Sequence, residues 1–313
     1  MQHPFEELLS VSIEQLELEF KGIQAIGWAD FWLNPRRLRG SDFLMRWSQG
    51  VWSENRLMDA VNKTDEYFAL PYGPSGTAPT DDVRAYELYF ERLEAAGLGS
   101  VKRPDLLIFS EKDRAYVEKT TADFGGVTEL PFVLESDLKE LISKALLAIE
   151  CENSLWVAGD MPAFGKPMTS QKRLGGKPGL SKTSVLPTVI IKEEDRQPLL
   201  RWQTEHQKPI HVWHVFFDRA YGLALDEAEQ LVAEGLILPE FQFLDSNSAK
   251  KKLYSFYYHY AYLVGTFIEE PHFVAEMYHG EDGRLVPYTK LAGGEFRLSE
   301  EANAILYQTK NWN

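Results

Sequence analysis

Cysteine is almost absent from this chain, and so are long apolar segments. The 313 residues contain one cysteine, Cys151, which excludes an internal disulfide bond and the paired-cysteine spacing of zinc sites. No stretch approaches the roughly 18 uncharged apolar residues that a membrane-spanning helix needs. The first residues, MQHPFEELLS, lack the basic and apolar regions of a secretory signal. We therefore expect a cytoplasmic protein that does not associate with a membrane.

Positive charge is also scarce. The chain has 47 acidic residues and 33 basic ones, which gives a formal net charge of −14 at pH 7. Binding to nucleic-acid phosphates requires lysine and arginine. The charge balance therefore argues against an extensive nucleic-acid surface and is compatible only with a local one.

Two short segments concentrate basic residues. One spans residues 166–182 and contains five cations and no acid, and the other spans residues 34–42. Each segment is expected either to contact DNA or to be a hydrated surface loop. A Walker-type nucleotide loop is excluded in the first segment, because Gly176-Lys177 is followed by Pro178. The candidate DNA-binding residues are Lys172, Arg173, Lys177, Lys182, Arg36, Arg37 and Arg39.

Apolar periodicity predicts an alternation of helices and strands. Helices are expected after Ser299 and over residues 5–20, 80–99, 135–148 and 224–235, and residues 41–64 are expected to form one or two helices broken near Gly50. The chain also predicts a loop over 69–79, a short hairpin within 285–298, and strands over 103–110, 115–121, 186–195, 210–218 and 251–267. This pattern indicates an α/β or α+β protein in which helices flank a mixed central sheet. Since no linker divides the chain, we expect one domain over residues 1–313, mainly helical over 1–100 and with the core sheet over 101–313.

Two carboxylates stand one residue apart directly after an apolar run. Glu150 and Glu152 follow the segment LISKALLAI, which ends at Ile149. On a strand, residues i and i+2 point to the same side, so both carboxylates would face one spot and Cys151 the opposite face. On a helix they would be about 200° apart and could not share a ligand. The periodicity permits both conformations, and we favour a strand after a break near Ala148, because only a strand gives the pair a common role.

A third carboxylate, Asp105, follows Pro104 at the start of the predicted strand 103–110. An aspartate on one strand and two glutamates on a neighbouring strand would form a site of oxygen ligands, which suits Mg²⁺. Such an ion activates water and stabilises the charge on a phosphoryl oxygen. A simple Pro-Asp turn and solvated or paired glutamates are the alternative reading of the same residues.

The order Pro104-Asp105, a gap, and then Glu150-x-Glu152 resembles the PD-(D/E)XK nuclease pattern in its E-x-E variant. Four longer segments are similar to type II restriction endonucleases of the AccI type: FLMRWSQGVWSENRLMDAVN, LPYGPSGTAP, RLEAAGLGSVKRPDLLIF and IECENSLWVAGDMP. The likeness extends over residues 40–300.

The resemblance implies a restriction-endonuclease-like fold and Mg²⁺-dependent hydrolysis of phosphodiester bonds in double-stranded DNA, with 5′-phosphate ends. It implies that Asp105 and Glu150 bind the metal and that Glu152 orients or deprotonates the attacking water. It adds Glu54, on an early helix, to the acidic site. It also implies a homodimer, a bacterial or archaeal host, and a companion DNA methyltransferase in a restriction-modification system.

The chain departs from the family pattern in two respects. The 45 positions between Asp105 and Glu150 require a helix inserted between the two strands. Glu152 replaces the usual lysine, which leaves open the group that polarises the nucleophile. Lys119 or Lys144 could reach the site from a neighbouring element. Two other functions remain as alternatives: a non-catalytic DNA-binding module with a nuclease-like fold, and a repair-type metal-dependent phosphodiesterase.

Two histidines and an aromatic stretch complete the candidate features. His211 and His214 are three positions apart in a predicted strand, so they are expected on opposite faces and in structural roles. The stretch 254–262, YSFYYHYAY, is expected to form core or a dimer surface in preference to a platform that stacks on nucleobases.

Overall fold

The fold is taken from a computed structural model, which describes residues 40–80, 83–99, 101–244, 249–279 and 283–312. The predicted helix 5–20 and the candidate DNA-binding residues Arg36, Arg37 and Arg39 lie outside these described residues. Among the helices of the described ranges, none combines the length and apolar character needed to cross a membrane.

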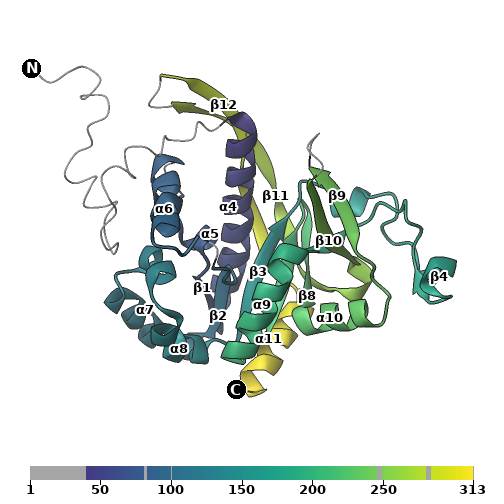
Figure 1. Ribbon diagram of the computed structural model, residues 1–313, viewed down its shortest axis with the longest axis horizontal. Coiled ribbons are helices and arrows are strands. Elements are labelled where there is room, and N and C mark those ends of the chain that lie inside the picture. Colours follow the sequence, from purple (N-terminus) through teal and green to yellow (C-terminus); the bar gives the residue numbers. More distant parts are fainter. Residues whose placement is uncertain (1–39, 81–82, 100, 245–248, 280–282, 313) are drawn as a thin grey trace, which may run out of the picture.

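A seven-stranded mixed sheet forms the centre of the molecule, with the strand order β1-β2-β3-β7-β8-β11-β12. Strands β3 and β7 run parallel, and the other neighbouring pairs run antiparallel. Figure 1 shows β11 and β12 continuing beyond the other strands as a long two-stranded ribbon. The strands are β1 Tyr67–Pro71, β2 Leu106–Ser110, β3 Leu147–Asn153, β7 Ile210–Val215, β8 Arg219–Ala224, β11 Tyr262–His279 and β12 Leu285–Leu298.

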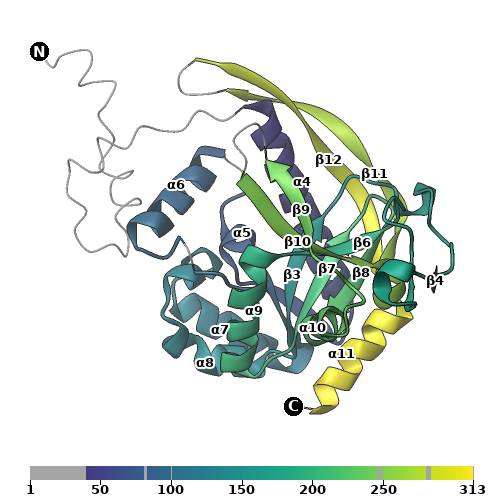
Figure 2. The same ribbon diagram turned by 45° about the vertical axis from the view of Figure 1, so that its right-hand side comes forward.

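Helices cover both faces of this sheet. On one face, α4 (Ser41–Asn62) and α11 (Glu300–Trp312) pack on a core that includes Ile149 and Trp213. The opposite face carries α7 (Arg114–Asp123), α8 (Glu135–Lys144), α9 (Glu193–His206) and α10 (Leu225–Ala233), and its core includes Ala148 and Val212 (Figure 2). Alternate residues of β3 therefore enter different cores, as the period of a strand requires.

Smaller elements complete the architecture. A three-stranded sheet of β6 (Thr188–Lys192), β10 (Ala249–Tyr257) and β9 (Glu240–Leu244) adds Tyr254 and Phe256 to the α7–α10 core, as expected for this aromatic stretch. Strands β4 (Thr169–Ser170) and β5 (Pro178–Gly179) pair with each other. The other helices of the described residues are α5 Pro74–Thr77 and α6 Val83–Ala95. Their short 3₁₀ turns are Glu111–Asp113, Val127–Phe132, Ala158–Asp160, Lys172–Leu174 and Tyr258–Tyr260.

The predicted class, helices around a mixed sheet, is confirmed, and so is the Ser299 cap, whose Oγ accepts a hydrogen bond from Ala302 N at 3.0 Å. The expected break near Gly50 is wrong, because α4 is continuous. One glycine inside a helix costs about 1 kcal/mol, and the buried Trp52 and Leu57 outweigh it. The expected loop 69–79 is wrong at its start, because β1 joins the central sheet. Strand β1 thus lies within the part, 1–100, that was expected to be mainly helical.

Three strand predictions also need correction. Residues 115–121 belong to α7, where Val117 and Thr121 are buried at helical spacing. The stretch 251–267 is divided between β10 and β11 by the turn Tyr258–Tyr260, and the two strands belong to different sheets. Residues 285–298 form one strand, β12, whose hairpin partner is β11.

Candidate functional site

The structure resolves the conformation of Glu150 and Glu152 in favour of a strand. Helix α8 ends at Lys144, four residues before the expected break, and Ala145 is extended with ψ of 142°. Strand β3 follows, and its Glu150 and Glu152 stand opposite Val212 and His214 of β7. Both glutamates therefore lie on the sheet face that carries α7–α10, and Cys151 packs against the other core, as predicted.

Asp105 lies against the middle of this glutamate pair. Its Oδ2 accepts a hydrogen bond of 2.7 Å from Cys151 N, and its Oδ1 accepts one of 2.5 Å from Ser75 Oγ. The backbone carbonyl of Asp105 accepts hydrogen bonds from Tyr72 N and Gly73 N at 2.8 and 3.1 Å. A Cβ at Gly73 would lie 2.7 Å from Pro104 O, so only glycine permits this close approach. The Pro104-Asp105 turn is thus fixed at β3. Helix α8 lies between β2 and β3 in the chain, as expected, and α7 is a second inserted helix that was not expected.

Glu54 belongs to the same acidic group but comes from the helix on the opposite face of the central sheet. It lies on α4, and its Oε2 is 3.0 Å from the position that a Cβ on Gly76 would occupy. Burial raises the pKa of Glu54 well above its usual value, and the negative charges of Asp105 and Glu150 raise it further. The structure therefore brings all four predicted acidic residues, Glu54, Asp105, Glu150 and Glu152, to one end of β2 and β3.

Two lysines neutralise part of this negative charge. Lys102 Nζ forms an ion pair with Glu150 Oε1 and lies 3.7 Å from Asp195 Oδ1, and Lys192 Nζ lies 2.6 Å from Glu152 Oε1. Burial alone would lower the pKa of each lysine. The negative charge of Glu150 at Lys102 and of Glu152 at Lys192 acts in the opposite direction, and the pKa of each lysine is raised above its usual value.

The lysines suggested by the sequence are placed elsewhere. Lys144 Nζ lies 5.7 Å from the centre of the Tyr116 ring, and Lys119 is exposed on α7. Lys102 and Lys192, which were not predicted from the sequence, supply the ammonium groups at the two glutamates instead. Lys102 stands only three positions before Asp105, which was a usable signal.

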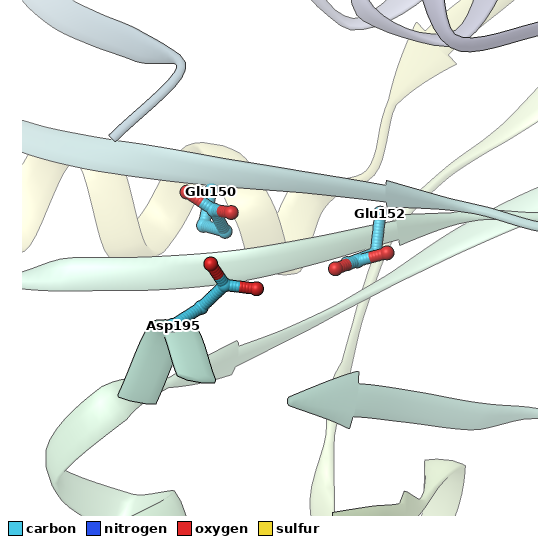
Figure 3. A group of neighbouring side chains, drawn as sticks. All are labelled: Glu150, Glu152 and Asp195. Atoms are coloured by element: carbon cyan, nitrogen blue, oxygen red, sulfur yellow. The ribbon is translucent and has the colours of Figure 1, made fainter. Parts of the chain in front are cut away.

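Asp195 is a further carboxylate that the sequence analysis missed. Figure 3 shows it projecting from the first turn of α9 toward Glu150 and Glu152, and the ligand oxygens of the three residues lie within 4.8 Å of one another. The predicted strand 186–195 obscured it, since β6 ends at Lys192 and α9 begins at Glu193. Three consecutive acids after a β-branched run are typical of a helix start, where the helix dipole favours negative charge.

Glu150, Glu152 and Asp195 could hold a metal ion. Glu150 is 5% exposed, and its Oε2 has no hydrogen-bond partner among the described residues. Burial raises the pKa of Glu150 well above its usual value, followed by the charge of Asp105, and burial also raises the pKa of Glu152 against the opposing charge of Lys192. Crowded, desolvated carboxylates of this kind are stabilised by a hard cation with oxygen preference.

The two histidines lie on opposite faces, as predicted. His211 Nδ1 lies 2.9 Å from Tyr262 OH, which also accepts a hydrogen bond from Trp213 Nε1. His214 lies on the glutamate face, is 2% exposed and stacks on Phe216 with 4.7 Å between ring centres. Neither of its ring nitrogens has a hydrogen-bond partner in the described part of the chain. Burial lowers the pKa of His214 to about 3, and the charge of Lys192 contributes in the same direction.

Two of the basic side chains in the segment 166–182 form hydrogen bonds with backbone carbonyl groups of this protein. Arg173 Nη2 donates to Leu180 O at 2.7 Å, and Lys177 Nζ donates to Glu234 O. Lys172, Arg173, Lys177 and Lys182 are all exposed. In Figures 1 and 2 the β4 part of this segment lies at the edge of the molecule, outside the strands that carry the acidic residues.

An open pocket of about 570 Å³ adjoins the end of β3. Gln49 of α4 and the segment that follows β3 line it, and Trp156 in that segment is 58% exposed. The loop is held in place, because Phe217 N donates to Trp156 O at 3.0 Å and Ala158 N donates to Asp218 Oδ1 at 2.6 Å. A large indole is thus presented to solvent on a fixed loop, four residues after Glu152.

No protein-family model, curated protein or solved structure matches this chain.

Proposed function

We propose that this protein is a Mg²⁺-dependent endonuclease of the type II restriction class, with a restriction-endonuclease-like core, that hydrolyses phosphodiester bonds in double-stranded DNA. The hydrogen bond from Cys151 N to Asp105 Oδ2 carries the proposal. It joins two residues that are 46 positions apart and brings the Pro-Asp and Glu-x-Glu halves of the pattern into one acidic centre. The pairing of Leu106 with Ile149 in neighbouring strands gives this contact a rigid base.

The residues present suit the cation that this chemistry requires. Asp105 and Glu150 offer carboxylate oxygens from adjacent strands, and Glu150 Oε2 is buried without a hydrogen-bond partner among the described residues. These two residues would hold Mg²⁺, with Glu54 as a further nearby acid. When bound, the ion supplies charge stabilisation for the phosphoryl group that is attacked.

The pair Glu152 and Lys192 would position the attacking water in this proposal. Lys192 comes from β6, yet its Nζ lies 2.6 Å from Glu152 Oε1, so it provides the ammonium that the sequence pattern lacks. Burial raises the pKa of Glu152, which makes its carboxylate a better proton acceptor than an exposed one. In this pair Glu152 would act as the base, and the positive charge of Lys192 would orient its carboxylate.

The DNA would approach along the end of β3. The exposed Trp156 offers a surface on which a nucleobase can stack, and Gln49 offers an amide of the kind that pairs with adenine. Lys172 and Lys182 are the exposed candidates for phosphate contacts. Cutting both strands of a palindromic site calls for a two-fold homodimer. A restriction enzyme also implies a companion methyltransferase in the host.

The test is a cleavage assay on the full chain with two conservative variants. Asp105→Asn and Glu150→Gln should each reduce Mg²⁺-dependent DNA cleavage by at least about a hundredfold, because each removes a charge at the reacting centre. Glu118→Gln, an exposed change on α7, is the matched control and should cut like the wild type. Full cleavage by either site variant would remove the basis of the proposal.

A further inference from the structure

We propose that the open pocket beyond the end of β3 is a subsite for one unpaired nucleobase of a DNA substrate. The base stacks on the indole of Trp156 and presents its hydrogen-bonding edge to Asp160 and Gln49, which also line the pocket. The inference rests on the proposed function for DNA as the ligand, whereas its test measures binding and not cleavage.

The pocket adjoins the acidic centre along two elements. Ser154 follows Glu152 by two residues, and Gln49 precedes Glu54 by five residues on α4. At about 3.4 Å per extended residue and 1.5 Å per helical residue, each separation is about 7 Å. One DNA strand rises about 3.4 Å per nucleotide. When a phosphate lies at the acidic centre, the pocket is therefore within reach of a base about two nucleotides away.

The loop that carries Trp156 is held by hydrogen bonds on both sides of the indole. In addition to the two bonds described above, Ser154 N donates to Val215 O at 2.8 Å. Gly159 N donates to Asp218 Oδ2 at 3.1 Å. Because these bonds already order the loop, little conformational entropy is lost when a ligand stacks on the indole.

Two large apolar side chains are exposed next to each other at this pocket. Leu155 is 44% exposed and Trp156 is 58% exposed, and adjacent apolar groups rimmed by polar ones mark binding surfaces. The volume of about 570 Å³ lies within the range of roughly 300–1,000 Å³ that small-ligand sites have. A flat aromatic ligand therefore suits the pocket.

The exposed indole also decides between a paired and an unpaired base. A paired base shows a groove reader only its edge, because the bases above and below it cover its faces. A base that leaves the stack can lie flat against an aromatic side chain. Stacking on Trp156 therefore requires a base outside the double helix.

The polar lining favours guanine among the four DNA bases. The exposed Asp160 offers a carboxylate, which only accepts hydrogen bonds, and Gln49 offers an amide that can also donate one. The pairing edge of guanine carries two adjacent donors, at N1 and N2, beside the acceptor O6. The pairing edges of adenine, cytosine and thymine each lack two adjacent donors. A carboxylate together with an amide donor therefore matches guanine.

The experiment compares three short fluorescein-labelled DNA duplexes by fluorescence anisotropy, with Ca²⁺ in place of Mg²⁺. One duplex contains a single bulged guanine, the second has the same bulge with an abasic nucleotide, and the third is fully paired. The full-length protein should bind the bulged-guanine duplex at least about tenfold more tightly than the abasic duplex, because stacking on an aromatic side chain stabilises a bound base. The two bulged duplexes share one backbone, so a preference for bent DNA cancels.

Trp156→Ala should remove the preference for bulged guanine over the abasic bulge, and Trp156→Phe, which keeps an aromatic ring, should retain most of it. Phe241→Ala is the matched control, because Phe241 is 57% exposed and lies on β9. It should bind all three duplexes like the wild type. Melting temperatures establish that each variant is folded.

Asp160→Asn tests the edge of the base. The wild type should prefer bulged guanine to bulged adenine, cytosine and thymine, and Asp160→Asn should reduce this preference by about fivefold or more, since it replaces a pure acceptor. Asp65→Asn, an exposed change between α4 and β1, carries the same charge change and should leave the preference unaltered.

Equal affinity of the wild type for the bulged-guanine and abasic duplexes would overturn the inference, and so would an undiminished preference in Trp156→Ala. An undiminished guanine preference in Asp160→Asn would overturn the assignment of the base. If the preference depends on Trp156 and no DNA is cut, the proposed function fails and the nucleobase subsite stands. If plasmid is cut and binding does not depend on the bulged base, the subsite fails and the proposed function stands.

Discussion

His214 gives the most quantitative prediction, because its lack of hydrogen bonds among the described residues lowers stability at neutral pH and its burial lowers stability further as the pH falls. We consider His214→Phe, which keeps an aromatic ring against Phe216 and removes both ring nitrogens. At pH 7.5 the variant should be more stable than the wild type by about 1 kcal/mol, since two buried polar atoms without partners among the described residues are replaced by apolar ones. Overpacking by the larger ring works against this gain.

The pH dependence has a magnitude that follows from the low pKa. Burial lowers the pKa of His214 from 6.5 to about 3, so the unfolded chain takes up a proton that the folded chain refuses. Stability due to this residue is therefore present above pH 6.5 and is lost as the pH falls. Between pH 7.5 and 5.5 the loss is about 1.4 kcal/mol at 25 °C, and His214→Phe is spared it.

Urea unfolding followed by tryptophan fluorescence at pH 7.5 and 5.5 measures the effect as a difference between the two proteins, so other titrating groups cancel. His211→Phe is the comparison variant, because it is also buried but loses the contact with Tyr262 and should be less stable than the wild type at pH 7.5 by about 1 kcal/mol. Equal pH dependence of the wild type and His214→Phe would show that burial does not keep the His214 imidazole uncharged.

Three further predictions concern the helix, the core and the acidic group. Gly50→Ala should raise the free energy of unfolding by about 0.5–1 kcal/mol in urea, because Gly50 lies inside α4 and an added Cβ meets no atom within 4 Å; a loss of stability would contradict a continuous helix. Tyr72→Phe should lower the free energy of unfolding by about 1–3 kcal/mol, because the buried Tyr72 hydroxyl lies 2.9 Å from Glu135 Oε2 and accepts a hydrogen bond from Trp202 Nε1 at 3.3 Å. An unchanged free energy of unfolding would show that these contacts do not stabilise the core. Burial, and then the charge of Asp105, raise the pKa of Glu150 above its usual value of 4.5, so the folded chain binds this proton more tightly than the unfolded chain. The melting temperature in EDTA should therefore fall as the pH rises from 4.5, and Glu150→Gln should lessen that fall. Parallel melting profiles of the wild type and Glu150→Gln would contradict the raised pKa.

Much of the fold could be predicted where local pattern and tertiary environment agree. The strand at 106–110, the helix α10 and the Ser299 cap follow from apolar periodicity and capping chemistry. The predictions failed where long-range packing decides. Gly50 is tolerated because α4 is buried against the sheet, and residues 115–121 are helical although their composition permits a strand.

The acidic site shows the same division. The i, i+2 spacing of Glu150 and Glu152 correctly predicted a shared face once the segment was taken as a strand. Lys192 and Asp195 were not predicted, because Lys192 comes from β6 of the three-stranded sheet and Asp195 from α9, which follows β6. A single sequence does not show that these elements pack next to Glu152. The boundary between β6 and α9 was the one local clue, in the three acids that open the helix.

A supercoiled-plasmid assay shows whether the acidic centre of Asp105, Glu150 and Glu152 cuts DNA. The full-length protein is incubated with plasmid and Mg²⁺, with an EDTA sample as control, and the ends of any fragments are sequenced. With Mg²⁺ we expect discrete fragments that share one terminal sequence and carry 5′-phosphates, and in EDTA we expect none. Plasmid that remains supercoiled with Mg²⁺, across many plasmid sequences, would contradict this expectation, and random or damage-dependent nicking would indicate a repair-type phosphodiesterase instead.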